Sequence, residues 1–314
     1  EAVLAAVDSV TDSDLPGVLS NLGGHDLRSL IEIFDEAERD LSRPTVIFAY
    51  TIKGWGLPFA GDPLNHSKLL SQEQMDALKQ SLGVGPGQEW SPFPKDSAPG
   101  LACAEAQRRI FPTAATAESA SQLSIRDIPE TLSVRAQGWM STQQALGQLL
   151  MSISRTPRLA ERVVTISPDV STSTNLSGWI IKTGIFRSEG SSAAIAESDF
   201  STGWRQGPSG QHIELGISEM NLFMALGMFG LSSELCGQQI IPIGTVYDPF
   251  VCRGLDSLIY ALYSGAKFIF AGTPSGITLA PEGGAHQSTV TPSLGLELPD
   301  LDSCEPCLRW RWNG

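Results

Sequence analysis

The chain has 314 residues, of which 41% are hydrophobic and 18% are charged, a composition typical of a globular protein with a substantial core. Its net charge of −13 argues against nucleic acid and anionic membrane surfaces as partners, because both require clustered lysine and arginine. We find no signal-peptide or transit-peptide pattern and no apolar run of membrane length, and we expect a cytoplasmic protein.

The first third of the chain combines helical and strand-like patterns. Apolar residues recur at helical spacing over residues 27–41, with Asp26 as the expected N-cap. The consecutive apolar residues of RPTVIFAYTIKG (43–54) predict a strand that is buried on both faces. A further helix is expected over residues 70–82, with Ser71 as its cap. This order of elements favours an α/β fold.

A stretch rich in proline and glycine, residues 84–100, predicts a linker. We place the domain boundary there or in the weakly patterned residues that continue to about residue 135. The chain opens without an initiating methionine and closes on LRWRWNG, so we expect a fragment of a longer protein.

The second half returns to alternating strands and helices. Helices are expected over residues 141–155, 218–231 and 253–265, and strands in RVVTISPD (162–169), QQIIPIGTVYDPF (238–250) and AKFIFAGTPSG (266–276). This alternation predicts an open parallel sheet, in which ligands bind at the carboxyl ends of the strands. The residues expected at those ends are Asp169, Tyr247, Asp248, Phe250, Thr273, Ser275, Glu282 and His286.

The five cysteines are scattered along the chain. Cys236 and Cys252 have apolar neighbours in sequence and are expected in the core. Cys304 and Cys307 form a single CxxC, which is a weak signal for zinc binding or redox chemistry without further ligands nearby.

A single carboxylate, Glu219, opens the otherwise apolar run EMNLFMALGMFG (219–230). An ionised carboxylate that is buried without a partner is unfavourable, so this residue is expected to hold a specific group. The alternative is an ordinary glutamate in the first turn of a helix, where the helix dipole favours negative charge.

Several motifs together resemble one family of enzymes. They are LGGHDL (22–27), RPTVIFAYTIKGWG (43–56), LNH (64–66), SPD (167–169), GISE (216–219), YDPF (247–250) and GTPSGITLAPEGGAHQS (272–288). As a set they resemble the homodimeric E1 component of 2-oxo acid dehydrogenase complexes, of the pyruvate dehydrogenase type. That family is part of the transketolase-like thiamine diphosphate enzymes.

The resemblance implies an α/β fold with two thiamine-diphosphate-binding-type domains, each with a mostly parallel sheet flanked by helices. Residues 1–85 would be the C-terminal part of the diphosphate-binding domain, which is therefore incomplete, and residues 86–135 a linker. Residues 136–300 would form the pyrimidine-binding domain, and residues 301–314 would begin the connection to a further C-terminal domain.

The resemblance also implies cofactors, a reaction and partners. The cofactors would be thiamine diphosphate and Mg²⁺; the family's GDG metal motif does not occur here, so the metal ligands are expected in a missing N-terminal part. The reaction would be oxidative decarboxylation of a 2-oxo acid, with pyruvate the expected substrate. The acyl unit would pass to the lipoyl group of a dihydrolipoyl acyltransferase. The enzyme would be a homodimer with its active site at the subunit interface.

By its match to GISE, Glu219 would hydrogen-bond the N1′ atom of the cofactor's aminopyrimidine and promote its basic tautomer. Phe250 would stack on that ring, with Tyr247 beside it. Because this loop is one residue shorter than in better-known members, ordinary core aromatics remain the alternative for both side chains.

The resemblance assigns further roles to loop residues. His66 and His286 match histidines that protonate intermediates and position the 2-oxo acid, since imidazole gains and loses protons near neutral pH. Asp169 matches an active-site acid. Lys53 is either a partner for a carboxylate or phosphate or a solvated lysine. Two other histidines are given no catalytic role: His25 is expected to cap an element, and His212 to lie on the surface.

Two other functions remain open. A transketolase would transfer two-carbon units between sugar phosphates, although this chain carries few of the arginines and histidines that grip phosphate. A non-catalytic remnant that acts as a dimerising or regulatory subunit is the other reading, and a GDG segment upstream in the parent gene would exclude it.

Overall fold

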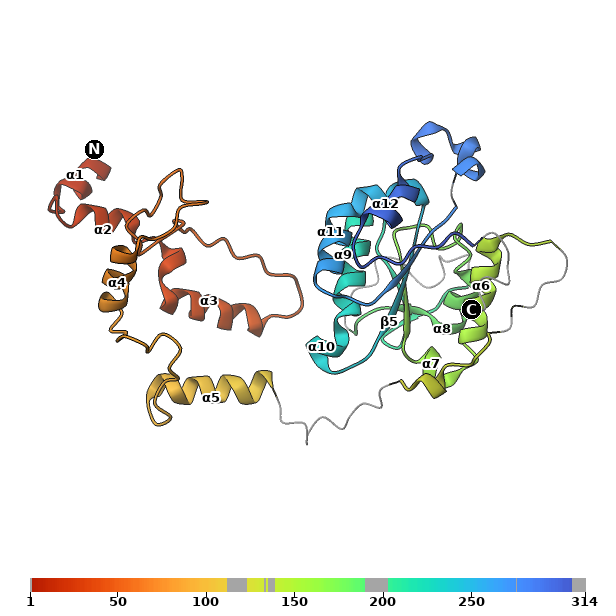
Figure 1. The fold of residues 1–314 in the computed structure, drawn as a ribbon, viewed down its shortest axis with the longest axis horizontal. Helices are drawn as coiled ribbons and strands as arrows, with labels where there is room; N and C mark the ends of the chain where they lie inside the picture. The colour runs from red at the N-terminus through yellow and green to blue at the C-terminus, as the bar shows by residue number, and fades with distance from the viewer. Residues whose placement is uncertain are drawn as a thin grey trace. The chain divides into compact units, whose positions relative to one another are not determined.

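The computed structural model describes residues 2–111, 123–132, 134, 139–189, 203–274 and 276–306. The chain divides into two compact units, Glu1–Ile110 and Phe111–Gly314, each of which is described by itself (Figure 1).

The first unit is built from helices and loops. Its helices are α1 (Ala2–Asp8), α2 (Leu15–Ser20), η1 (Gly23–His25), α3 (Leu27–Arg39), α4 (Gln72–Ser81) and α5 (Ala98–Ile110). The predictions of α3 and α4 are confirmed, together with their caps. The Asp26 carboxylate accepts the backbone N–H of Arg28, and Ser71 and Gln74 form a reciprocal capping box at the start of α4.

The strand expected over residues 43–54 is wrong: no strand occurs in the part of the first unit that the structure describes. Val46, Phe48 and Tyr50 are each at least 74% exposed. A strand requires neighbouring strands for its backbone hydrogen bonds, and the described residues of this unit supply none. The segment is instead held by local contacts, such as the bond from the Gly24 N–H to the Tyr50 carbonyl oxygen (3.0 Å).

The second unit contains a six-stranded sheet. Its strands are β1 (Val163–Ser167), β2 (Ile185–Phe186), β3 (Gln206–Gly207), β4 (His212–Glu214), β5 (Ile241–Val246) and β6 (Ile269–Gly272), in the order β3-β2-β4-β1-β5-β6. Every pair of neighbouring strands runs parallel, which confirms the predicted parallel α/β architecture. Strands β2 to β4 have two or three residues each, too short for a sequence pattern to reveal.

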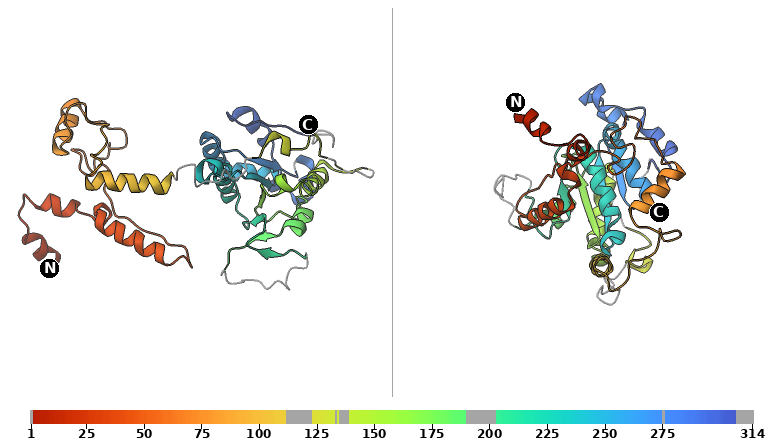
Figure 2. Two further views of the ribbon diagram at one scale, coloured as in Figure 1. Left: turned by 90° about the horizontal axis from the view of Figure 1, so that it is seen from below. Right: turned by 90° about the vertical axis from the view of Figure 1, so that its left-hand side faces the viewer.

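Helices cover both faces of this sheet (Figures 1 and 2). They are α6 (Thr142–Ile153), α7 (Pro157–Ala160), α8 (Ser177–Thr183), α9 (Glu219–Gly230), α10 (Ser232–Cys236), α11 (Leu255–Tyr263) and α12 (Thr291–Glu297). Short 3₁₀ segments are η2 (Ile125–Asp127), η4 (Asp248–Gly254), η5 (Gly276–Glu282) and η6 (Gly284–His286). None of the helices in the described residues combines the length and the apolar character needed to cross a membrane.

Residues on opposite faces of β1 and β5 enter different hydrophobic clusters, as the two-residue period of a strand requires. Val163 and Ile243 pack with α6 and α8, whereas Ile166 and Val246 pack with α9 and α11. Helix α9 contributes three fully buried apolar side chains, Leu222, Phe223 and Leu226. Each stabilises the fold by roughly 1.5–3 kcal/mol through removal from water. This packing fixes the first turn of α9 against the sheet.

Two cysteines are not where the sequence predicted them. Cys236 and Cys252 are exposed, not buried, because they lie at the end of α10 and in η4, where the chain leaves the core.

Candidate functional site

Glu219 is the first residue of α9 and is buried, with 7% of its surface exposed. Its Oε1 atom lies 3.4 Å from Nη1 of Arg253, at the end of η4. Gly254 allows this approach. A Cβ atom at that position would lie 2.7 Å from the Glu219 carbonyl oxygen, so only glycine lets η4 pack so closely on α9.

Three side chains stand in a column along η4. Tyr247 immediately precedes this 3₁₀ helix, and Phe250 and Arg253 follow at intervals of three. Because residues three apart eclipse one another in a 3₁₀ helix, the three side chains are brought together. The Tyr247 and Phe250 rings are 6.0 Å apart between centroids, and the Arg253 guanidinium carbon lies 3.6 Å from the centroid of Phe250.

His286 reaches the same aromatic group from η6. Its ring centroid is 5.1 Å from that of Phe250 and 6.3 Å from that of Tyr247. Its Nε2 atom lies 3.5 Å from Oε2 of Glu282. Its Nδ1 atom is buried and finds no hydrogen-bond partner among the described residues. A buried polar atom without a partner is uncommon and marks a place where a ligand or water can bind.

Asp248 lies in η4 between the aromatic residues. Burial raises the pKa of its carboxyl above the ordinary value, and the nearby Glu305 carboxylate raises it further, partly offset by a hydrogen bond from Thr291.

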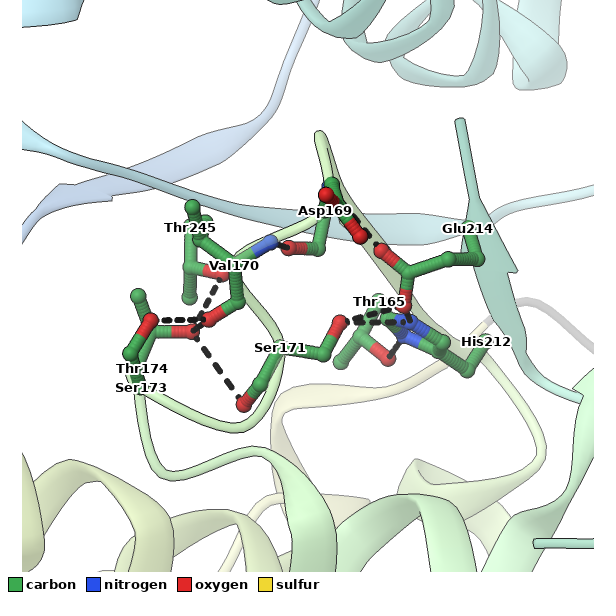
Figure 3. A network of polar contacts seen from close by, with 10 residues as sticks. Thr165, Asp169, Val170, Ser171, Ser173, Thr174, His212, Glu214 and Thr245 are labelled. Atoms are coloured by element: carbon green, nitrogen blue, oxygen red, sulfur yellow. Dashed lines mark hydrogen bonds and ion pairs between the residues drawn. The ribbon is translucent and has the colours of Figure 1, made fainter. Parts of the chain in front are cut away.

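His212 belongs to a second polar network, so its predicted place on the surface is wrong (Figure 3). The residue is fully buried on β4, directly beside Thr165 of β1. Its Nδ1 atom is 2.8 Å from the Thr165 hydroxyl, and its Nε2 atom is 3.0 Å from both the Ser171 hydroxyl and Oε2 of Glu214. These polar partners allow the imidazole to be buried within a parallel sheet.

The same network positions Asp169 at the carboxyl end of β1. The Asp169 backbone N–H donates to Oε1 of Glu214 (3.0 Å), and Ser171 donates to the other oxygen of that carboxylate (2.6 Å), as Figure 3 shows. Asp169 has a φ of +66°, a left-handed conformation that a residue other than glycine adopts only where its surroundings hold it. Glu214 therefore fixes the conformation of this loop.

The loop after β1 also reaches the aromatic group. The Tyr247 hydroxyl donates to Oγ of Ser173 (2.9 Å), and the hydroxyls of Thr174 and Thr245 are 2.9 Å apart. The loop with Asp169 is therefore tied to β4 on one side and to β5 and Tyr247 on the other.

Lys53 and His66 lie together in the first unit, with 3.3 Å between Nζ and Nδ1. The buried Asn65 side chain supports this pair by donating to the Lys53 carbonyl oxygen (2.6 Å). His25 was expected to cap an element, but instead it ties η1 to a loop: its Nε2 accepts the N–H of the loop residue Ile52 (2.7 Å), and its ring stacks on Trp55.

A hollow of about 530 Å³ is also present in the first unit. It is lined by Ser13, Asp14, Gly17, Val18, Asn21 and Trp55. None of these residues was predicted to act in catalysis or cofactor binding.

The structure thus brings Glu219, Tyr247, Phe250 and His286 into one group in the second unit, while Lys53 and His66 form a separate pair in the first. Two participants escaped the sequence analysis. The sequence indicates Arg253 only by its spacing of three residues after Phe250, which itself follows Tyr247 by three. This spacing places the three side chains together only if the segment is a 3₁₀ helix, as η4 is. Glu214 lies on a strand of three residues and carries no pattern of its own.

The structure does not test the CxxC pair: Cys304 is exposed, but Cys307 lies outside the described residues, as does Ser275. Within the part of the chain that the structure covers, no group of three or more histidine, cysteine or acidic side chains is arranged to hold a metal ion.

Comparison with known protein families gives a match. The profile of the pyruvate dehydrogenase E1 component middle domain matches residues 131–310. Among individual relatives, the pyruvate dehydrogenase E1 component of Corynebacterium glutamicum is 25% identical over 319 residues, covering 96% of this chain and 34% of that protein. The corresponding component of Mycobacterium tuberculosis is 26% identical over 326 residues, covering 98% and 35%. The chain thus spans about a third of the length of these relatives.

Solved structures show the same fold. The transketolase from Leishmania mexicana superposes with a TM-score of 0.62 at 19% identity, covering 88% of this chain and 40% of that one. The transketolase from Campylobacter jejuni gives 0.60 at 16% identity, with the same coverage. At such identities the likeness establishes a transketolase-like α/β fold and nothing about substrate.

Proposed function

Because this chain belongs to the pyruvate dehydrogenase E1 component family, matched through its middle domain, we propose that it contributes the pyrimidine-binding half of a thiamine diphosphate site. The whole protein would catalyse oxidative decarboxylation of a 2-oxo acid, with pyruvate as the expected substrate. The acyl group would be transferred to the lipoyl group of a dihydrolipoyl acyltransferase.

The proposal rests on one observation. Arg253 contacts both the buried carboxylate of Glu219 and the ring of Phe250, so a buried carboxylate and an aromatic face lie next to each other. A flat, nitrogen-rich ring needs an aromatic face to stack on and an acceptor for its N–H. Phe250 and Glu219 offer these two groups. The unpartnered Nδ1 of His286 offers a further polar contact beside them. The residues of the second unit therefore fit the cofactor's pyrimidine end.

Thiamine diphosphate, when bound, supplies the carbanion chemistry that removes CO2 from a 2-oxo acid. The chain's own residues would orient it and control protons. Glu219 would hold a proton at the N1′ position, in surroundings from which α9 and η4 exclude water. Phe250 would stack on the ring and Tyr247 would brace Phe250. His286 would position the 2-oxo acid carboxylate or exchange a proton with it.

The remaining assignments rest on the family match alone. We assign His66 and Lys53 to substrate and diphosphate contacts, and Asp169 to the cofactor site. Mg²⁺ would be held by ligands outside the described residues. Residues 1–85 would belong to the diphosphate-binding domain, 86–135 to a linker, 136–300 to the pyrimidine-binding domain and 301–314 to the connection that follows. A cytoplasmic location agrees with this assignment.

We further propose that two copies of the chain associate through α9 and α11. Met220, Met224 and Met228 recur every four residues along α9 and are 38%, 59% and 67% exposed. The neighbouring helix α11 presents Tyr260 and Tyr263, which are 64% and 86% exposed. Exposed apolar side chains gathered on two neighbouring helices are typical of a protein interface. Met220 is in contact with Ser257 of α11, which makes the two helices one surface.

Replacing both Met224 and Met228 with lysine is expected to convert dimer to monomer, weakening association by at least about tenfold, since the interface would bury unpaired charge. Sedimentation velocity of the full-length gene product measures this. The control is Ser209→Lys, at an exposed turn before β4, which should leave the dimer intact. A double variant that dimerises as well as the unmodified protein would exclude this surface.

The proposed reaction is tested with the full-length gene product, thiamine diphosphate, Mg²⁺ and a panel of 2-oxo acids, using an artificial electron acceptor. Reduction of the acceptor with pyruvate is expected. Activity on sugar phosphates alone would establish a transketolase instead. Absence of both cofactor binding and turnover would favour the non-catalytic remnant.

A further inference from the structure

Arg253 makes two contacts at once. Its guanidinium carbon lies 3.6 Å from the centroid of the Phe250 ring, and its Nη1 lies 3.4 Å from Oε1 of Glu219. Among the described residues, Arg253 is the ion-pair partner of Glu219, whose side chain is only 9% exposed.

These two contacts are the ones that the proposed function gives to the cofactor's aminopyrimidine. A guanidinium is flat, stacks on aromatic faces and directs N–H groups at carboxylates. A pyrimidine ring protonated at N1′ is also flat and also presents an N–H to a carboxylate. The two groups thus share shape and hydrogen-bonding character at the same pair of side chains.

We propose that the Arg253 side chain is an internal competitor for the pyrimidine subsite, which must leave the Phe250 face and Glu219 when the cofactor ring binds. The proposal rests on the proposed function. Two effects of Arg253 follow. Its side chain lowers the apparent affinity of the protein for the cofactor. It also favours ligands that replace both the contact with Phe250 and the contact with Glu219.

The backbone around Arg253 cannot make this movement. Gly254 packs against the Glu219 carbonyl oxygen with no room for a Cβ atom, so η4 is held on α9. The Arg253 side chain, by contrast, is 52% exposed and has several rotatable bonds. It can therefore turn into water while the column of Tyr247 and Phe250 stays in place.

Competition of this kind has a limited strength. The Arg253 side chain is 52% exposed, so water solvates the guanidinium nearly as well when it is displaced, and its ion pair and cation–π contact each contribute little. Removal of the guanidinium is therefore expected to tighten cofactor binding about fivefold to twentyfold, because the fraction of molecules whose pyrimidine subsite is free rises by the same factor.

The experiment measures the dissociation constant of thiamine diphosphate with Mg²⁺ by calorimetry, in the full-length gene product and its Arg253→Gln and Arg253→Lys variants. Glutamine keeps much of the length but not the charge, and lysine keeps the charge but not the flat group. Tighter binding is expected for Arg253→Gln, and an intermediate value for Arg253→Lys. Thermal unfolding without cofactor checks that both variants fold.

A double-variant cycle tests the role of the carboxylate. In a Glu219→Gln background, removing Arg253 should give a clearly smaller gain in affinity, because one of its two contacts is already weakened. An analogue of thiamine diphosphate with carbon in place of N1′ should likewise gain less from Arg253→Gln than the cofactor itself does, because it cannot replace the bond to Glu219.

Unchanged or weaker cofactor binding in Arg253→Gln would overturn the inference, and weaker binding would place Arg253 in the bound site as a permanent partner. Neither result contradicts the proposed function, provided that the unmodified protein binds thiamine diphosphate. If the unmodified protein does not bind it, the proposed function and the inference fail together.

Discussion

Glu219→Gln is expected to lower 2-oxo acid turnover by about 10²–10⁴-fold, the range typical for loss of a group that transfers or holds a proton in the rate-determining step. Glutamine matches glutamate in size, so the packing of the first turn of α9 should be retained. An amide, however, cannot accept and return the proton that the proposed role at N1′ requires. Steady-state kinetics with saturating cofactor measures the effect.

The fold should survive this change. Arg253, the partner of Glu219, is 52% exposed and can be solvated when the carboxylate is lost, so the thermal midpoint should move little. Glu219→Ala tests the same role with the side chain removed and should also abolish turnover. The matched control is Glu234→Gln on the exposed surface of α10, which should retain full activity. A fully active Glu219→Gln enzyme would remove this residue from the mechanism.

The elements predicted correctly are those whose pattern depends on their own residues. The caps at Asp26 and Ser71 define the starts of α3 and α4 through bonds to backbone groups two or three residues away. Strands β1 and β5 are five and six residues long, enough to show a buried apolar run. The apolar run after Glu219 likewise predicts α9, whose buried residues recur at the three- and four-residue spacing of one helix face.

The failures arise where a distant partner decides the outcome. Residues 43–54 have the composition of a buried strand, but a strand forms only when another chain segment pairs with it. His212 was predicted at the surface because a lone histidine gives no hint of Thr165, Ser171 and Glu214, which make its burial possible. These partners are brought together by strand pairing, which a single sequence does not reveal.

The same difference between local and distant determinants separates the site residues that were predicted from the one that was missed. Motif resemblance selected Glu219, Tyr247, Phe250 and His286, and the structure places all four in one connected group. Arg253 was missed because its importance depends on two distances, to Phe250 and to Glu219, that arise only when η4 closes on α9. That closure depends on Gly254.

Gly254→Ala is therefore expected to destabilise the protein by about 1–3 kcal/mol, as overpacking of a close contact does. The added Cβ would lie 2.7 Å from the Glu219 carbonyl oxygen, and a backbone oxygen of a helix cannot move aside without moving the helix. The φ of Gly254 is −109°, which alanine adopts freely, so sterics alone would cause the loss. Urea denaturation followed by circular dichroism measures it.

The same substitution should weaken thiamine diphosphate binding, because pushing η4 away from α9 separates Phe250 from Glu219. Gly207→Ala is the matched control: a Cβ atom there meets nothing within 4 Å, so stability should change by no more than about 0.5 kcal/mol. If Gly254→Ala matched the control in both stability and cofactor affinity, the junction between η4 and α9 would be loose. Glu219 and Phe250 would then not be held together by the fold, and the pairing of carboxylate and aromatic face would need another cause.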